Sequence, residues 1–130
     1  IKAALAAVRA RPFTLALRQT GRFPPGTNRP PRVLWVGISP QPALHALHGQ
    51  IERALTEVGF PPEERDFSPH ITLARLRPPQ GADAAAAFLN RSSRFQGDSF
   101  TVDQFHLISS VLSPQGPSYQ YMASFPLQNG

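Results

Sequence analysis

The chain has 130 residues, 41% of them apolar, a size and composition typical of one domain with its own core. Its formal net charge is +5, and of its 13 basic residues only Lys2 is not Arg, which favours bidentate contacts to phosphate or carboxylate groups of an anionic partner. The absence of Cys excludes disulfides, thiolate nucleophiles and Cys-bearing metal sites.

The hydropathy of the chain and its first residues bear on its cellular location. No apolar run approaches the roughly 18 residues that a membrane span needs, and no signal peptide opens the chain. We therefore expect a cytoplasmic monomer with no membrane partner. The chain begins with IKAALAAV and its one methionine is Met122, so we also expect a fragment whose N-terminal segment is missing.

The N-terminal part predicts a helix, a strand, a loop and a second strand. Residues 1–10 are Ala-rich with helical spacing of apolar positions, and apolar and polar residues alternate over 13–18 as in a half-buried strand. Residues 20–31 are dense in Pro and Gly and predict a long basic loop. Residues 32–38 are apolar on both faces, which is typical of a central strand.

The C-terminal part adds two helices and three strands. Ser39 is expected to cap the first of these helices, because apolar residues then recur at helical spacing as far as Val58. The remaining predictions are a strand from His70, a short helix over 82–94, and strands over 100–112 and 118–127 joined as a hairpin. This order indicates an α+β fold with a mostly antiparallel sheet, in one domain over 1–130.

The stretch FSPHITLAR, residues 67–75, carries the most informative polar pair. Side chains alternate along a strand, so His70 and Thr72 share one face, while Ile71 and Leu73 share the other and can anchor the strand to the core. An imidazole transfers protons in either direction near neutrality, and a Thr hydroxyl can donate a hydrogen bond to a phosphoryl oxygen. The pair is half of a metal-free phosphoester site, although a lone His-x-Thr also suits an ordinary surface strand.

The same stretch resembles the second signature of the two-histidine phosphoesterases, specifically the bacterial and archaeal RNA 2′,3′-cyclic phosphodiesterases, the LigT-like family once called 2′-5′ RNA ligases. The resemblance extends over RPFTLALRQTGRFPP, RVLWVGI, GFPPEERDFSPHITLARLR and FTVDQFHLISSVLSPQGPSYQYMASFPL, which is nearly the whole chain. It implies a two-lobed fold with mostly antiparallel sheets around a central cleft, into which each half contributes one His-x-Thr-x motif. One histidine then acts as base and the other as acid, while the threonines hold the phosphate.

Carried over by position, the resemblance makes His70 a catalytic histidine and Thr72 its phosphate ligand, with Arg75 as a candidate for substrate binding. Whether His70 is acid or base stays open. In an unbroken strand Arg75 points away from His70, so its role requires a bulge or the end of the strand near Ala74. In the predicted loop, Arg22 and Phe23 are candidates for holding an RNA end by charge and stacking.

No second His-x-Thr occurs in the sequence, which departs from the family pattern. We expect the first motif just upstream of Ile1, and the fragment alone to be at least about 100-fold less active than the intact enzyme. His106 is a weak substitute, because Ile108 stands where Thr should be. Residues 45, 48 and 52 (His, His, Glu) share one helix face, which could suggest metal ligation. A solvent-exposed helix face is the better interpretation, so we expect no metal and no cofactor.

The preferred function is hydrolysis of a terminal 2′,3′-cyclic phosphate on RNA or on a nucleotide to a 2′-phosphate, with reversible 2′-5′ RNA ligation as a possible second activity. One alternative is an RNA-end-binding module without turnover, which a lone His motif and a basic loop would allow. Another is a phosphodiesterase acting on a different small cyclic phosphate, such as ADP-ribose 1″,2″-cyclic phosphate.

Overall fold

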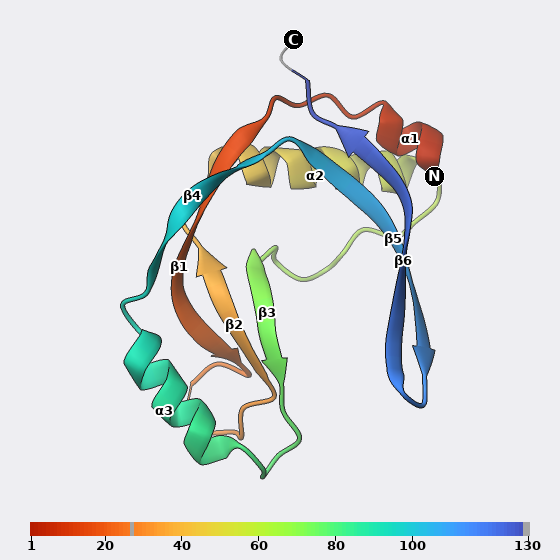
Figure 1. Ribbon diagram of the computed structural model, residues 1–130. Helices are drawn as coiled ribbons and strands as arrows, with labels where there is room; N and C mark the ends of the chain where they lie inside the picture. Colours follow the sequence, from red (N-terminus) through yellow and green to blue (C-terminus); the bar gives the residue numbers. More distant parts are fainter. Residues whose placement is uncertain (27, 129–130) are drawn as a thin grey trace. The chain divides into compact units, whose positions relative to one another are not determined.

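The computed structural model of the chain describes residues 1–26 and 28–128 (Figure 1). Residue 27, in the predicted loop, lies outside the described residues. The elements follow the order α1 (Lys2–Ala6), β1 (Phe13–Phe23), β2 (Val33–Ile38), α2 (Pro42–Glu57), β3 (His70–Arg75), α3 (Ala82–Ser92), β4 (Gln96–Val102), β5 (Gln104–Ser113) and β6 (Gly116–Pro126).

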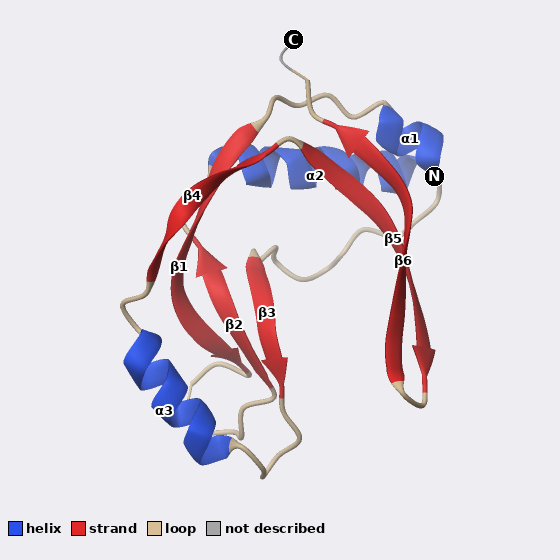
Figure 2. Cartoon of the chain, in the orientation of Figure 1, coloured by secondary structure: helices blue, strands red, loops and turns tan. Residues whose placement is uncertain are grey.

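The predicted α+β class with antiparallel sheets is confirmed. Figure 2 shows helices and strands mixed along the chain, and the strand pairs β1–β2, β2–β3 and β5–β6 are all antiparallel. The chain forms two compact units, in agreement with a two-lobed fold. The first unit comprises Ile1–Thr14, Pro42–Asp66 and the described residues from 101 onward; the second comprises Leu15–Gln41 and Phe67–Phe100.

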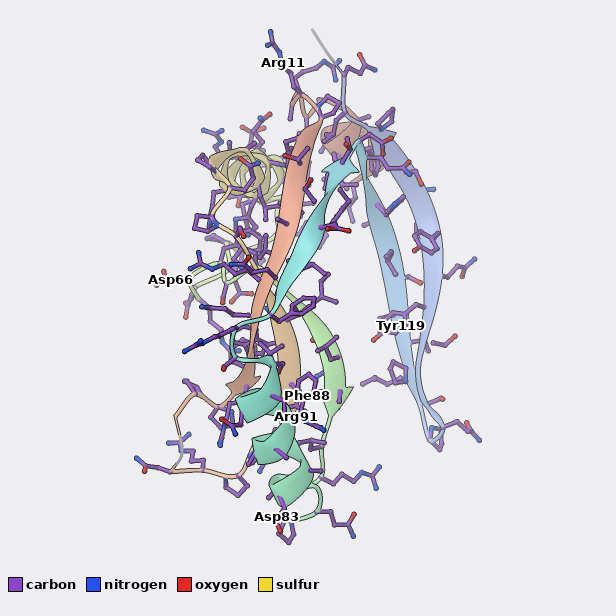
Figure 3. All side chains as sticks on the ribbon, turned by 60° about the vertical axis from the view of Figure 1, so that its left-hand side comes forward. Arg11, Asp66, Asp83, Phe88, Arg91 and Tyr119 are labelled. Carbon is purple, nitrogen blue, oxygen red and sulfur yellow. The ribbon has the colours of Figure 1, made fainter. Side chains whose placement is uncertain are left out.

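The second unit is built on a four-stranded sheet with the order β3-β2-β1-β4, so β3 is an edge strand. Leu34 and Val36 point to one face of the central strand β2 and are buried, which gives this face the core. Helix α3 packs against the same face, where the Thr20 and Ser92 hydroxyls are 2.6 Å apart. We call this side of the sheet the α3 face; Figure 3 shows α3 with Asp83 in its first turn.

The first unit packs α1 and α2 with the hairpin of β5 and β6. Its buried residues include Leu5 from α1, Leu47 from α2 and Phe125 from β6. The rings of Phe105 and Phe125, directly opposite each other in the hairpin, stack with their centroids 5.0 Å apart. Alternation along both strands therefore leaves the other face of the hairpin exposed.

The structure corrects the predicted start of the long loop. Residues 20–23, which the Pro and Gly content assigned to the loop, continue β1 to Phe23. The reason is pairing with a distant segment: Arg22 and Phe23 lie opposite Leu34 and Val33 of β2. Backbone hydrogen bonds to β2 outweigh the weak local preference for a turn.

Three other predicted boundaries were also wrong. The predicted strand over 100–112 is two strands, β4 and β5, separated by Asp103 and belonging to different sheets. Helix α2 begins at Pro42, because the backbone N–H of Ser39 donates to the carbonyl of Ala16 at 2.9 Å and so extends the sheet contacts past β2. The first helix ends at Ala6 rather than near residue 10. Among the described residues, no helix is long and apolar enough to cross a membrane.

Candidate active site

His70 is the first residue of the edge strand β3, and its side chain is exposed. Pro69 precedes it; a proline has no backbone N–H to donate to a sheet ladder and therefore suits a strand start. The Nδ1 atom of His70 donates a hydrogen bond to the carbonyl oxygen of Ser68, at 2.7 Å. The imidazole is thus held by the backbone immediately before the strand.

This hydrogen bond determines which ring nitrogen exchanges protons. A carbonyl oxygen only accepts, so Nδ1 of His70 carries the hydrogen and Nε2 has the free lone pair in the neutral ring. Nε2 can then take a proton as a base and return it as an acid. Such an arrangement, in which one nitrogen is bonded to the backbone and the other is open, suits general acid–base catalysis.

The strand register places the candidate residues in rows across the sheet. His70 lies opposite Gly37 of β2, and Gly37 lies opposite Arg18 of β1. In the next row, Thr72 lies opposite Trp35, which lies opposite Gly21. Residues directly opposite each other share a face. We call this the His70 face; it is the side of the sheet opposite the α3 face.

A bulge in β3 brings Arg75 to the His70 face. Trp35 pairs with Thr72 and Leu34 pairs with Ala74, which leaves Leu73 as the extra residue. The next pair, Val33 with Arg75, follows the alternation of β2 and so falls on the side of Trp35. A substrate-binding role for Arg75 required a bulge or the strand end near Ala74, and the structure has such a bulge.

Two aromatic rings surround the imidazole of His70. The ring centroids of Phe23 and His70 are 5.0 Å apart in an edge-to-face arrangement, with an interplanar angle of 85°. The Trp35 centroid is 6.3 Å from that of His70 and 5.6 Å from that of Phe23. Phe23, one of the predicted substrate-binding residues, therefore lies beside His70.

Arg22 is directed to the other side of the sheet. It pairs with Leu34, a residue of the α3 face, and its guanidinium donates through Nε to the carbonyl of Pro24 at 2.9 Å and through a terminal nitrogen to the carbonyl of Arg29. The structure thus brings His70, Thr72, Arg75 and Phe23 to one face and Arg22 to the opposite one. Arg22 therefore contacts two backbone carbonyls of the basic loop.

The expected anchoring of β3 by its apolar residues is only partial. Ile71 is 42% exposed and Leu73 is 51% exposed, so neither belongs to the core. Their strand lies at the sheet edge, and Leu73 is the bulge residue at the margin of an apolar cavity that it lines with Val36 and Phe88. The strand is instead held by its pairing with β2, whose Leu34 and Val36 are buried.

The other histidines belong to the first unit. His106 lies opposite Ser124 in the hairpin, and its Nδ1 is 2.8 Å from the Ser124 hydroxyl, which can donate or accept and so does not determine the tautomer. Its ring meets Tyr121 edge to face at 5.1 Å. On α2, Nε2 of His48 is 3.9 Å from a carboxylate oxygen of Glu52. The described residues contain no group of three or more His, Cys, Asp or Glu arranged to hold a metal ion.

Trp35 and Gly21 were missed as site residues by the sequence interpretation. Trp35 was assigned to a strand buried on both faces, and Gly21 to a loop. A Cβ atom built on Gly21 would lie 2.1 Å from the indole of Trp35, so only glycine leaves room for this ring. A glycine within a strand marks a close approach by another group, and that signal is readable once β1 is extended to Phe23.

An imidazole and a hydroxyl side by side on one sheet face are groups that a metal-free phosphoester reaction uses. Comparison with known families agrees. The model of the 2′-5′ RNA ligase superfamily matches residues 1–113. The chain belongs to this superfamily, which confirms the resemblance found in the sequence.

Two curated relatives are named RNA 2′,3′-cyclic phosphodiesterase. The protein of Aeropyrum pernix is 37% identical over 119 residues, which are 89% of this chain and 65% of the relative. The protein of Methanothermobacter thermautotrophicus is 32% identical over 116 residues, 89% of this chain and 61% of the relative. The chain therefore spans less than two thirds of the length of either relative.

Among solved structures, the protein TT0787 of Thermus thermophilus matches with a TM-score of 0.70 and 27% identity. The match covers 97% of this chain and 68% of TT0787. The two-lobed phosphoesterase fold predicted from the sequence is thereby confirmed.

Proposed function

We propose that the protein is an RNA 2′,3′-cyclic phosphodiesterase in which His70 performs one of the two proton transfers. The observation that carries the proposal is the geometry of His70: its Nδ1–H is bonded to the Ser68 carbonyl and its ring is exposed, so Nε2 is open to a substrate. The Thr72 hydroxyl and the Arg75 guanidinium share its face. The names of the relatives support the choice of substrate.

The chemistry needs a proton removed on one side of phosphorus and a proton supplied on the other. The water oxygen forms a bond to phosphorus and loses a proton to a base, while the bond from phosphorus to the ribose O3′ breaks and O3′ receives a proton. The products are a 2′-phosphate and a 3′-hydroxyl. Nε2 of His70 fills one of these roles, and each role is worth about 10²- to 10⁴-fold in rate. With a 5′-hydroxyl in place of water as the nucleophile, the same displacement forms a 2′-5′ linkage.

Two further residues are assigned to substrate binding. The Thr72 hydroxyl donates to a phosphoryl oxygen, and Arg75 presents its guanidinium donors to the same anion. Phe23 stays a prediction as a contact to the RNA end; its ring lies beside His70, with 5.0 Å between the ring centroids. Arg22 stays a prediction as an RNA contact, since its guanidinium bonds the loop carbonyls. A cytoplasmic monomer likewise stays a prediction.

Turnover of adenosine 2′,3′-cyclic phosphate tests the proposal. His70→Ala should lower the hydrolysis rate by at least about 100-fold, because a proton-transfer group is lost. His45→Ala is the matched control, since His45 is an exposed histidine on α2 of the first unit and should leave the rate unchanged. Equal rates for His70→Ala and the unaltered protein would refute the assignment.

A second candidate is an RNA-end-binding module without turnover. One observation favours it: the described residues contain a single strand of the His-x-Thr type, and in the hairpin Ile108 follows His106 two positions later. The experiment above separates the two. A module binds the cyclic nucleotide without releasing a 2′-phosphate, and His70→Ala then changes neither turnover nor affinity.

A further inference from the structure

Three rings from three adjacent strands form a cluster, and one of them is the imidazole of the proposed catalytic residue. Phe23 comes from β1, Trp35 from β2 and His70 from β3, with all centroid separations between 5.0 and 6.3 Å. The Phe23 ring meets the imidazole at 85°, close to the perpendicular arrangement that aromatic pairs favour. Ring contacts of this kind can fix the orientation of the His70 imidazole.

His70 needs such contacts because little else restrains it. It is exposed on an edge strand, and its ring is tied to the backbone through the hydrogen bond from Nδ1 to Ser68. One hydrogen bond fixes a point on the ring but leaves the ring plane free to turn about it. A ring edge packed against the imidazole fixes the plane, and with it the direction of Nε2.

Gly21 gives this cluster its shape. It lies opposite Trp35 in the sheet, and a Cβ atom at Gly21 would lie 2.1 Å and 2.3 Å from two carbons of the indole. The indole therefore rests on the backbone of β1. The Trp35 Nε1 atom is buried and has no hydrogen-bond partner among the described residues, so the ring is held by packing.

We propose that Phe23 and Trp35, resting on Gly21, form an aromatic clamp that positions the imidazole of His70 for proton transfer. The clamp makes Phe23 and Trp35 positioning residues and gives Gly21 a role that no side chain can replace. The catalytic role of the clamp rests on the proposed function, in which His70 transfers a proton. The clamp also differs from base stacking by Phe23, which would act on substrate affinity rather than on rate.

The first test is spectroscopic and does not depend on turnover. Trp35 is the one tryptophan of the chain, so its emission reports on this cluster alone. An imidazolium quenches a nearby indole, so emission should fall as the pH is lowered and His70 takes a proton. His70→Gln should remove this pH-dependent change, while His45→Gln should keep it. An unchanged titration in His70→Gln would overturn the clamp.

The second test separates positioning from substrate binding. Phe23→Leu should lower kcat by about 2- to 12-fold, the range that one aromatic contact is worth, with KM nearly unchanged. Gly21→Ala should lower kcat by at least about 10-fold, because it displaces the indole and disturbs both of the other rings. Gly49→Ala, on the open surface of α2, is the control with no effect.

The outcomes remain distinguishable if a variant folds poorly. Phe23→Tyr keeps the ring edge and should restore kcat to within about 3-fold of the unaltered protein. A Phe23→Leu variant that folds poorly would lose the pH-dependent emission of Trp35, whereas a folded variant keeps it, so a lower kcat in the folded variant reports the lost positioning contact. A rise in KM with kcat unchanged would overturn the clamp in favour of stacking. If the unaltered protein shows no turnover at all, the proposed function fails, and the emission experiment still decides the clamp.

Discussion

Arg75 lies on the same face of β3 as Thr72 although three positions separate them in the chain. The cause is the bulge at Leu73, which leaves that residue without a partner in the strand register and shifts the alternation by one. A guanidinium and a hydroxyl are thereby placed on the side of the sheet that also carries His70. Under the proposed function, an anion would meet a charged donor and a neutral donor beside the imidazole.

We expect Arg75→Ala to raise the KM for adenosine 2′,3′-cyclic phosphate by about 10- to 150-fold, the value of hydrogen bonds to a charged group. The fold should remain, because Arg75 is exposed at the end of an edge strand. Arg91→Ala is the control: Arg91 is exposed on α3, which packs on the opposite face, and its loss should leave KM unchanged. A KM equal to that of the unaltered protein would contradict the assignment of Arg75.

Thr72→Val should weaken binding of adenosine 2′-phosphate by about 10-fold, because valine keeps the branched shape and removes the hydrogen bond. Isothermal titration calorimetry measures this directly. Thr56→Val, on an exposed position of α2, serves as the matched control. If both variants bind the nucleotide equally well, the Thr72 hydroxyl has no part in holding phosphate.

Arg22→Ala separates the two roles that can be given to this residue. Its guanidinium bonds the carbonyls of Pro24 and Arg29, so we expect a lower melting temperature and a loss of RNA affinity smaller than that of Arg75→Ala. A fluorescence melt and a binding titration with a short RNA measure the two effects. Equal losses of affinity in the two variants would instead favour the RNA contact that the sequence predicted.

The stability of the second unit depends on β2. Leu34→Ala should reduce the free energy of unfolding by about 2–5 kcal/mol, because Leu34 is buried and the cavity left behind is only partly refilled. Its relative exposure is 7%, whereas that of Leu112 on the hairpin is 82%. Leu112→Ala should therefore stay within about 0.5 kcal/mol of the unaltered protein. Chemical denaturation checks both values.

Much of this could be predicted from the sequence where the signal is local. The alternation around His70, the apolar run that became β2 and the helical spacing of α2 each specify their own element. The course of β1 through Gly21 to Phe23 could not be predicted, because it depends on hydrogen bonds to β2 across a long loop. The position of Arg75 likewise depends on a bulge. Pairing with Leu34 and Trp35 sets this bulge, and no local sequence pattern indicates it.

The most direct test is a long-range ¹H–¹⁵N spectrum of the histidine rings, recorded while adenosine 2′-phosphate is added to the protein. The chain has four histidines, so each ring can be followed by itself. We expect a saturable shift of the His70 Nε2 resonance, with the hydrogen bond from Nδ1–H to Ser68 retained and the resonances of the His45 and His48 rings unchanged. A His70 ring that stays unchanged while the nucleotide binds elsewhere, or a nucleotide that does not bind at all, would contradict this expectation.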